Sequence, residues 1–585
     1  MEPSADNVSR QPGSGAAKVL GRSDLLSIVH GIAAVVLLQL ALGIYATALN
    51  TLFYAHYGPF YDSLAYLDDL ARMQAIARSR GALAAFWEQV RHSTVVYPWM
   101  LFAPLARFLA ANRSNGIWLQ IIASAYMQTL FFIYFLRVRQ ATFAIAFVFS
   151  ATFSLLACVF GYNGGLPDFR MDLLQYFLLA AVLATYLIAR QTSGIGWWVL
   201  LGFNIGLLCL GRATSPVYVA PIVLILALAD VITDAAKSRI LLVRWALACF
   251  TAAAVAGWFY IVNFNYLHFY YVIWNPDANA RLPIMQSSQH LRFALAHIGN
   301  VLLAILITIG AATLLANARM RGHFGTLRLH WRPLLFSIVP LGYLVSSGSG
   351  LNPFVSIVGC CGIVLFLLDP IDDIRPPIGP WTRVVLLSAL SAGFLVNAAS
   401  GVDNTSSDKV VSVYIPRQEG LRQIVKILRH NAAQDGGQER TYTYAVAHIG
   451  ALTTDVLFNI LVYDHGLAST ERLEACDGAI CFVRASRTWA SSTRIIWEQT
   501  PAETDEQRLD KVMAELAERT DFLLLPSDDS QLLSHIFTNR FVPEISRRVL
   551  QSSHWAQLAN PITVSPVERV LIMRNQSRVN QNGGK

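Results

Sequence analysis

The sequence predicts an α-helical polytopic membrane protein with about eleven transmembrane helices, followed by a C-terminal soluble α/β domain. Of its 585 residues, 54% are hydrophobic and only 14% are charged, whereas soluble domains carry about 25% charged residues. The apolar residues gather in segments of roughly 17–25 residues, the length that a helix needs to cross about 30 Å of hydrocarbon. The last third of the chain lacks such segments and has the composition of a soluble protein.

The net charge of +8 does not indicate a nucleic-acid-binding protein. Most Lys and Arg residues flank the apolar segments, where positive charge sets the orientation of a membrane protein. No solvated basic domain stands out, so we expect membrane lipid and no nucleic acid among the partners.

The apolar segments divide the chain into an N-terminal tail (1–24), a membrane domain (25–400) and a soluble domain (401–585). The polar start of the chain has no cleavable signal sequence, so the first apolar segment is predicted to stay as an anchored span. The predicted spans lie near 25–48, 116–136, 141–162, 172–189, 195–211, 214–230, 240–262, 296–316, 333–348, 351–368 and 383–399.

Positive charges predict the orientation of these spans. If the tail is cytoplasmic, the connections on that side hold most of the basic residues, such as Arg190, Lys237 and the run from Arg319 to Arg332. This satisfies the positive-inside rule. The segment Tyr97–Ala111 is apolar but short and interrupted by two prolines, which is typical of an interfacial or re-entrant segment. The odd number of spans then exports the soluble domain.

The large external loop of residues 50–115 contains a helical pattern with acidic residues on one face. Asp62, Tyr66 and Asp69 follow at i, i+4 and i+7, so they share one side of a helix. The alternative without a functional role is an interfacial helix whose acidic side chains only face water. The apolar stripe expected to lie on the membrane surface consists of Leu64, Leu67, Leu70 and Ala71.

Charged residues also stand at the mouths of later spans. Asp172 begins a span, and Asp168 and Arg170 precede it on a turn that contains Gly and Pro. An acid is favourable at a helix N-terminus, so capping is the simple explanation for Asp172. Arg212 lies in a very short connection, where it either snorkels to the membrane surface or binds a lipid phosphate. Arg281, in the aromatic loop 263–297, is a weaker candidate for ligand binding.

Strands that alternate with helices in the soluble tail predict a small α/β layer domain. TYTYAVAHI (441–449), DFLLLPS (521–527) and RVLIM (569–573) have strand patterns, and Thr504–Arg519 has a helical pattern. No phosphate loop, nucleophile elbow or metal motif occurs in the tail, so we expect a structural or acceptor-recognition role. Cys476 and Cys481 form either a disulfide, if the domain faces an oxidising compartment, or two free thiols.

The order of these features resembles that of the family C glycosyltransferases, and within them the protein O-mannosyltransferase and lipid A aminoarabinose-transferase type. Members carry an Asp, commonly in D-E-x-x-Y, just after the first span, which Asp62-Ser63-Leu64-Ala65-Tyr66 matches except at Ser63. The stretch from His92 to Pro98 keeps only the outline of their H-P-P-L-Y-P motif. The stretch Asp172–Phe177 is similar to their second acid motif, and Arg212 precedes a span containing Pro216 and Pro221. The resemblance covers about residues 25–400.

The resemblance implies a glycosyltransferase that moves a sugar from a polyprenyl-phosphate donor to a lipid, glycan or protein acceptor on the outer face of a bacterial inner membrane. It implies Asp62 and Asp172 as catalytic carboxylates, with Asp62 activating the acceptor hydroxyl. A divalent ion between the acids is compatible with this chemistry, although the sequence has no dedicated ligand set. The expected substrate-binding residues are Tyr66, His92, Arg170, Arg212 and Arg281.

Two other classes of function stay open on the sequence. Transporters and lipid flippases often show internal repeats and ionisable residues near the membrane midplane, whereas the spans here hold few charges. A non-catalytic envelope-assembly protein would use the exported tail to bind a partner.

Overall fold

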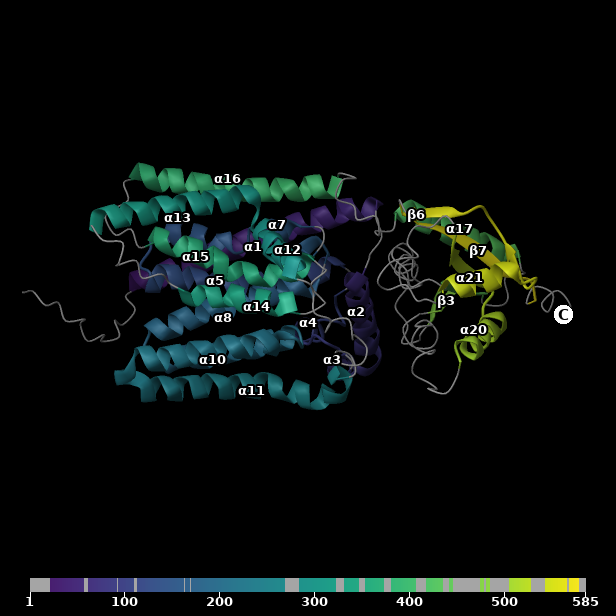
Figure 1. Ribbon diagram of the computed structural model, residues 1–585, viewed down its shortest axis with the longest axis horizontal. Coiled ribbons are helices and arrows are strands. Elements are labelled where there is room, and N and C mark those ends of the chain that lie inside the picture. The colour runs from purple at the N-terminus through teal and green to yellow at the C-terminus, as the bar shows by residue number, and fades with distance from the viewer. Residues whose placement is uncertain are drawn as a thin grey trace, which may run out of the picture.

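The computed structural model describes residues 22–56, 61–91, 93–109, 113–161, 164–168, 170–268, 284–321, 331–346, 353–372, 380–406, 417–434, 441–445, 474–477, 480–483, 504–527, 542–565 and 568–577. Long helices run side by side in one bundle, and a separate domain with a β-sheet stands beyond one end of it (Figure 1). The predicted fold class, a helical polytopic membrane protein with a C-terminal sheet domain, is confirmed.

Each of the eleven predicted spans contains a helix. Six helices are individually long and apolar enough to cross a membrane, or seven if the bent pair α12–α13 is one span, among the described residues. The number of crossings therefore stays a prediction. The six are α1 (Arg22–His56), α5 (Arg113–Ile133), α8 (Met171–Gln191), α10 (Ser215–Thr233), α11 (Ser238–His268) and α16 (Pro380–Ser406).

The remaining bundle helices are shorter or broken. The pair α12 (Ile284–Ile298) and α13 (Asn300–Arg321) bends by 90° at Gly299, whose φ of 98° suits glycine. A π-helical turn at Tyr134–Val138 ends α5. The others are α6 (Phe143–Thr152), α7 (Ala157–Phe160), α9 (Ile195–Gly211), α14 (Trp331–Ser346), the 3-10 helix η8 (Pro353–Gly359) and α15 (Cys360–Asp372).

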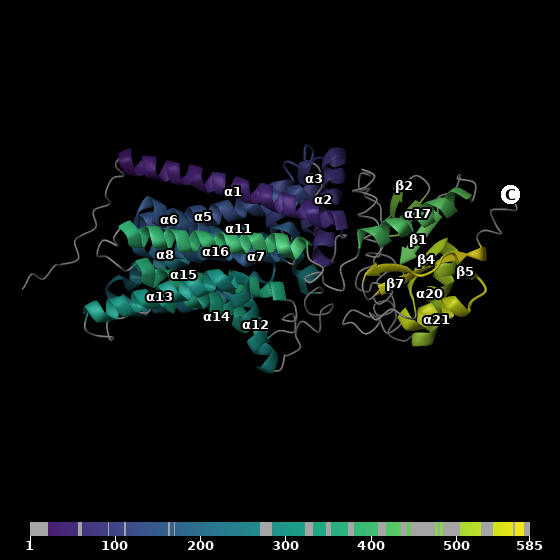
Figure 2. The ribbon, with the colours of Figure 1, turned by 90° about the horizontal axis from the view of Figure 1, so that it is seen from above.

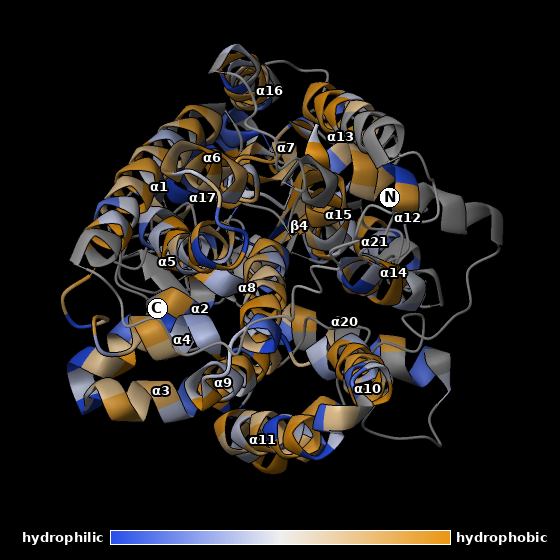
Figure 3. Cartoon of the chain, turned by 90° about the vertical axis from the view of Figure 1, so that its left-hand side faces the viewer, coloured by the Kyte–Doolittle hydropathy of each residue, from blue (hydrophilic) through white to orange (hydrophobic). Residues whose placement is uncertain are grey.

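Helix α8 is the centre of the bundle. Seen along the bundle, the other long helices surround it (Figure 3). Within its apolar window 94% of the residues are buried, whereas only 22% are buried in α11. The apolar side chains of α8 therefore pack on protein, while those of α11 are left for lipid.

The external loop forms three short helices at one end of the bundle: α2 (Tyr61–Arg80), α3 (Ala82–Val90) and α4 (Tyr97–Phe102). Helix α2 lies transverse to the bundle axis (Figures 1 and 2). Six residues of helix rise only about 9 Å, so α4 is too short to cross a bilayer, as the prolines predicted. The apolar stripe of α2 was assigned wrongly to the membrane surface, because Leu67 and Leu70 are buried in the core of the bundle.

The soluble domain contains a mixed sheet in the order β2-β3-β1-β4-β7-β5, with β6 also paired to β7. Strand β1 is parallel to β3 and β4, and the other pairs are antiparallel. The strands are β1 (Thr441–Ala445), β2 (Glu474–Asp477), β3 (Ile480–Val483), β4 (Phe522–Pro526), β5 (Trp555–Gln557), β6 (Ile562–Ser565) and β7 (Glu568–Asn575).

Helices cover both faces of this sheet. Helix α17 (Gln418–Gln434) packs on the face of Phe522 and Leu524. Helices α20 (Asp505–Arg519) and α21 (Val542–Gln551) pack on the face of Leu523 and Leu525. Alternate residues of a strand point to opposite faces, so an uninterrupted apolar strand such as β4 needs cover on both sides.

Two predictions for the soluble domain concern the cysteine pair and the length of the first strand. Cys476 and Cys481 lie directly opposite each other in the antiparallel pair β2–β3. Directly opposed positions have Cα separations of about 4.5–5.5 Å, which a disulfide can span. This register suits a disulfide, whose formation stays a prediction. The end of the TYTYAVAHI strand, residues 446–449, lies outside the described residues.

The soluble domain stands at the end of the bundle that carries α2. Helix α1 runs toward this end, and α16 leads from the bundle to it (Figure 2). Gly401 of α16 packs closely on Leu49 of α1 and Phe160 of α7 there. The connection between α10 and α11, which contains Lys237, lies at the opposite end.

A labelling experiment tests the predicted orientation. In a variant without native cysteines, Glu506→Cys on the exposed surface of α20 should react with an impermeant maleimide in intact spheroplasts. Lys237→Cys is the matched control, since the Lys237 side chain is 68% exposed at the other end of the bundle. It should react only after lysis. Reaction of Lys237→Cys in intact spheroplasts, with Glu506→Cys protected, would reverse the predicted topology.

Candidate active site at the ends of α8 and α9

The first turn of α8 holds Asp172 inside the protein. Arg170 precedes the helix in extended backbone conformation, and Asp172 follows in the first turn with 2% of its surface exposed. The partial positive charge of a helix N-terminus favours a carboxylate at this position. The middle of α8 is apolar, and Asp172 lies at its N-terminal end. This end of the helix is on the side of the bundle that carries α2 and faces the soluble domain.

Arg212 reaches Asp172 from the connection between α9 and α10. Its backbone leaves α9 in extended conformation, and Nη1 of the guanidinium donates a hydrogen bond to Oδ1 of Asp172. The Asp172 side chain is 3% exposed and the Arg212 side chain 23% exposed. Two residues that are 40 positions apart, and that the sequence singled out separately, thus form one ion pair whose cation reaches the surface.

A second polar contact supports this pair one turn deeper. Gln175 Nε2 of α8 donates to the hydroxyl of Ser215 at 2.9 Å, and the hydroxyl of Tyr218 donates to the same oxygen at 3.1 Å. Ser215 is the first residue of α10. The beginnings of α8 and α10 are therefore tied together next to Arg212.

The backbone around Arg212 is held by the segment that resembles the H-P-P-L-Y-P motif. The amide of Val96 donates to the carbonyl of Leu210 at 2.7 Å, and the amide of Ala213 donates to the carbonyl of Thr94 at 2.8 Å. The hydroxyl of Tyr260 in α11 lies 2.9 Å from the carbonyl of Cys209 in the last turn of α9 and 3.3 Å from the carbonyl of Ala213 in the connection. Sequence reasoning did not connect these segments, because the contacts run between backbones that no side-chain motif marks.

Arg170 and Asp168 form a second ion pair, which is fully buried. Nε of Arg170 lies 2.5 Å from Oδ2 of Asp168, and both side chains are at most 1% exposed. The amide of Gly164 donates to the same oxygen at 2.8 Å, and Gln120 Nε2 donates to the carbonyl of Arg170 at 3.0 Å. This arrangement favours a role for Arg170 in fixing the turn before α8, since a ligand outside the protein has little access to its guanidinium.

The other predicted site residues are located less completely. Asp62 belongs to the first turn of α2, and Tyr66 is half-buried against the core of the bundle. His92 and Arg281 lie outside the described residues. Convergence of Asp62 with Asp172 and Arg212 therefore stays a prediction, with all three at the same end of the bundle. No group of three His, Cys, Asp or Glu side chains that could hold a metal ion occurs in the described part of the chain.

Comparison with known proteins gives a fold but no close relative. No protein-family model matches the sequence, and no curated protein is significantly similar to it. The structure of ArnT from Cupriavidus metallidurans bound to undecaprenyl phosphate matches with a TM-score of 0.54 and 11% identity, over 92% of this chain and 97% of that chain. The chain has the fold of the family C membrane glycosyltransferases.

Two further structures match the chain. The apo state of the same ArnT matches with a TM-score of 0.51 and 11% identity, over 91% of this chain and 98% of that chain. The arabinofuranosyltransferase AftD from Mycobacteria matches with a TM-score of 0.42 and 13% identity, over 91% of this chain and 40% of that chain. The two ArnT matches extend over nearly the whole of both chains, so the likeness includes the soluble domain.

A double-mutant cycle tests the Asp172–Arg212 pair. We expect Asp172→Ala and Arg212→Ala to be coupled by about 1–3 kcal/mol in the free energy of unfolding, because removing one partner leaves a largely buried charge uncompensated. The exposed pair Asp234–Lys237, at 3.5 Å, is the control and should show a coupling below about 1 kcal/mol. Equal coupling in the two cycles would mean that the Asp172–Arg212 contact does not hold the site together.

Proposed function

We propose that this protein is a glycosyltransferase that moves a sugar from a polyprenyl-phosphate donor to a hydroxyl of a lipid, glycan or protein acceptor. The observation that carries the proposal is the ion pair of Asp172 and Arg212 at one end of a bundle with the ArnT fold. The ArnT structure that matches this chain is described as bound to undecaprenyl phosphate. We transfer that ligand class to this chain as part of the proposal.

Arg212 is the residue that we assign to the donor phosphate. A guanidinium carries five N–H donors, so its bond to Asp172 is compatible with binding phosphate oxygens as well. Asp172 is buried while Arg212 is partly exposed, so the acid orients the arginine and the arginine is presented to the ligand. Arg170 would fix the turn that carries Asp172, and Tyr66, His92 and Arg281 would complete the substrate site.

The reaction requires a base and a stabilised leaving group. The acceptor oxygen forms a bond to the anomeric carbon, while the bond from that carbon to the phosphate oxygen breaks. The electron pair leaves with the polyprenyl phosphate, whose increased negative charge is stabilised by Arg212. The proton of the acceptor hydroxyl passes to a carboxylate, for which we propose Asp62.

The position of the charges suits a lipid-linked donor. The polyprenyl chain stays in the hydrocarbon while its phosphate reaches the helix ends, where Arg212 lies. We place this end of the bundle on the outer face of a bacterial inner membrane, so that α2 and the soluble domain meet the acceptor. In the interior of the bundle, the described polar contacts join neutral groups, as between Gln39 and Gln128 at 2.6 Å and between Tyr126 and Asn204 at 2.7 Å. This arrangement favours a transferase over an ion-coupled transporter, which places ionisable groups near the midplane.

Transfer assays with purified variants test the assignment. Asp62→Asn keeps the size of the side chain but cannot accept the proton, so turnover should fall by about 10²–10⁴. Arg212→Ala should mainly raise the donor concentration needed for half-maximal rate. Glu88→Gln changes an acid of α3 at the same end of the bundle, with 43% side-chain exposure, and is the control that should keep wild-type turnover.

Two results would contradict these roles. Near wild-type turnover of Asp62→Asn would remove Asp62 as the base, and retained turnover of both Asp62→Asn and Asp172→Asn would remove the site. Movement of intact donor across vesicles without covalent transfer would favour the flippase alternative. A cellular role that survives both substitutions would favour the envelope-assembly alternative.

A further inference from the structure

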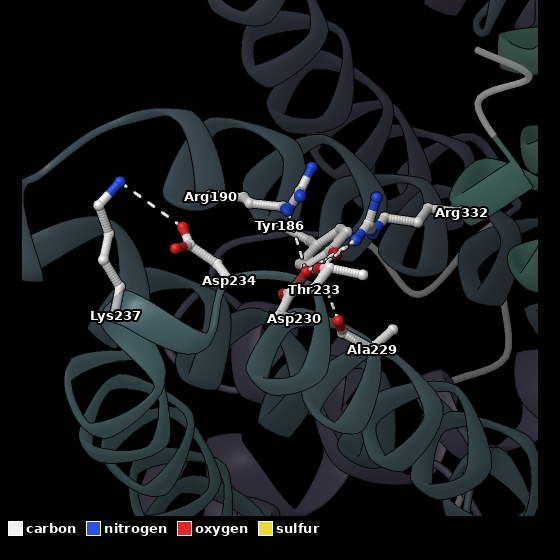
Figure 4. Close-up of polar contacts among 8 residues, drawn as sticks. All are labelled: Tyr186, Arg190, Ala229, Asp230, Thr233, Asp234, Lys237 and Arg332. Atoms are coloured by element: carbon white, nitrogen blue, oxygen red, sulfur yellow. Dashed lines mark hydrogen bonds and ion pairs between the residues drawn. The ribbon is translucent and has the colours of Figure 1, made fainter.

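A second cluster of charged side chains lies at the opposite end of the bundle, where α8 ends. Nε of Arg190 donates to Oδ1 of Asp230 in α10 at 2.9 Å, and Nη2 of Arg332 in α14 lies 3.3 Å from the same oxygen. The hydroxyl of Tyr186 lies 3.2 Å from each carboxylate oxygen. Three helices thus meet at one buried carboxylate, which is 1% exposed (Figure 4).

The cluster carries more positive than negative charge. Among the described residues, two arginine guanidinium groups surround one carboxylate, that of Asp230, and a guanidinium carries a positive charge. The neighbouring Asp234 pairs with Lys237 at 3.5 Å and leaves this balance unchanged. A partly buried cation without a counter-charge is costly, so an anion at this place would stabilise the protein.

Both arginines reach the surface at this point. The Arg190 side chain is 32% exposed and that of Arg332 is 17% exposed. The contacts of Arg190 with Asp230 use Nε, and its terminal nitrogen atoms point away from the carboxylate (Figure 4). An anion at the surface could therefore accept hydrogen bonds from Arg190 without displacing Asp230.

Large apolar side chains are exposed at this end of the bundle, beside polar ones such as Lys237. Ile232 of α10 is 75% exposed and Trp331 of α14 is 40% exposed, and the guanidinium of Arg332 lies 5.2 Å from the centre of the Trp331 ring. Trp is enriched at the level of lipid headgroups, and the exposed apolar side chains are those that acyl chains cover. The ligand that matches this surface combines a phosphate with acyl chains.

We propose that Arg190 and Arg332 bind the phosphate of an anionic phospholipid in the leaflet at this end of the bundle. This site differs from the one assigned to the donor. Asp172 and Arg190 are 18 residues apart in α8, which corresponds to about 27 Å along the helix. The inference depends on the membrane-embedded fold and not on glycosyl transfer.

Lipid titration of the full-length protein in a neutral detergent, followed by native mass spectrometry, tests the site. Phosphatidylglycerol should bind more tightly than phosphatidylcholine, whose phosphate is balanced by its own ammonium group. Arg332→Gln leaves Arg190 as the only arginine paired with Asp230 in this cluster, which then has no net charge. Phosphatidylglycerol should therefore bind about tenfold more weakly, the loss expected for one charge-assisted hydrogen bond. Arg190→Gln should act in the same way and serves if Arg332→Gln does not fold.

Two further variants separate binding from a merely structural role. Arg244→Gln removes another arginine at this end, which bonds to the carbonyl of Ser193 at 2.8 Å, and should leave the affinity unchanged. Asp230→Asn raises the charge of the cluster, so phosphatidylglycerol should bind at least as tightly as in the wild type. Weaker binding to Asp230→Asn, an equal loss in Arg244→Gln, or wild-type affinity in both Arg190→Gln and Arg332→Gln would overturn the proposal. Displacement of the lipid by equimolar inorganic phosphate would also overturn it, because free phosphate would then be the ligand.

Discussion

The hydrocarbon of a bilayer offers no water to charged groups, and this constraint organises the structure around α8. This helix is buried along most of its length, so its charged side chains are confined to its two ends. Each of them finds a partner near an end of α10: Asp172 pairs with Arg212 just before that helix, and Arg190 pairs with Asp230 in its last turns. The same two helices are therefore tied to each other at both ends of α8. The position of Arg212, on which the proposed chemistry depends, follows from this packing.

At the end of the bundle with Asp172 and Arg212, the described helices are interrupted at two places. A short non-helical segment separates α6 from α7, and α12 meets α13 at a sharp bend. One side chain is hydrogen-bonded to the backbone at both places. Nδ2 of Asn397 in α16 donates to the carbonyl of Leu155 at 3.0 Å and to that of Ile298 at 3.1 Å. Because α16 continues toward the soluble domain, the same helix that fixes these breaks also connects the membrane domain to the sheet. Functional residues often lie on irregular segments held by a rigid scaffold, and the proposed donor site has this arrangement.

The sequence predicts the helices far better than their contacts. Apolar segments of membrane-spanning length identify the bundle helices except α12, whose residues were assigned to the aromatic loop 263–297. The FLLLP strand follows from apolar residues flanked by turn residues. Strands β2, β3, β5 and β6 were not predicted, because a strand of three or four residues is too short to show a clear alternation of apolar and polar residues. Asp172 and Arg212 were both singled out, yet their pairing depends on how α8 packs against its neighbours. Arg190 and Arg332 were interpreted as orientation signals alone, since nothing in their local sequence indicates that Asp230 lies between them. The stripe of α2 was assigned to lipid because periodicity shows which face is apolar and not what covers it.

The central claim is that Arg212 receives the phosphate of the donor while Asp62 faces the sugar from α2. An experimental structure of the full-length protein with a polyprenyl phosphate tests it most directly. The account predicts a phosphate oxygen within hydrogen-bonding distance of the Arg212 guanidinium, with Asp172 still bonded to that arginine and Asp62 turned toward the same cavity. A phosphate bound away from Arg212, or an Asp62 carboxylate directed to the far side of α2, would contradict the account.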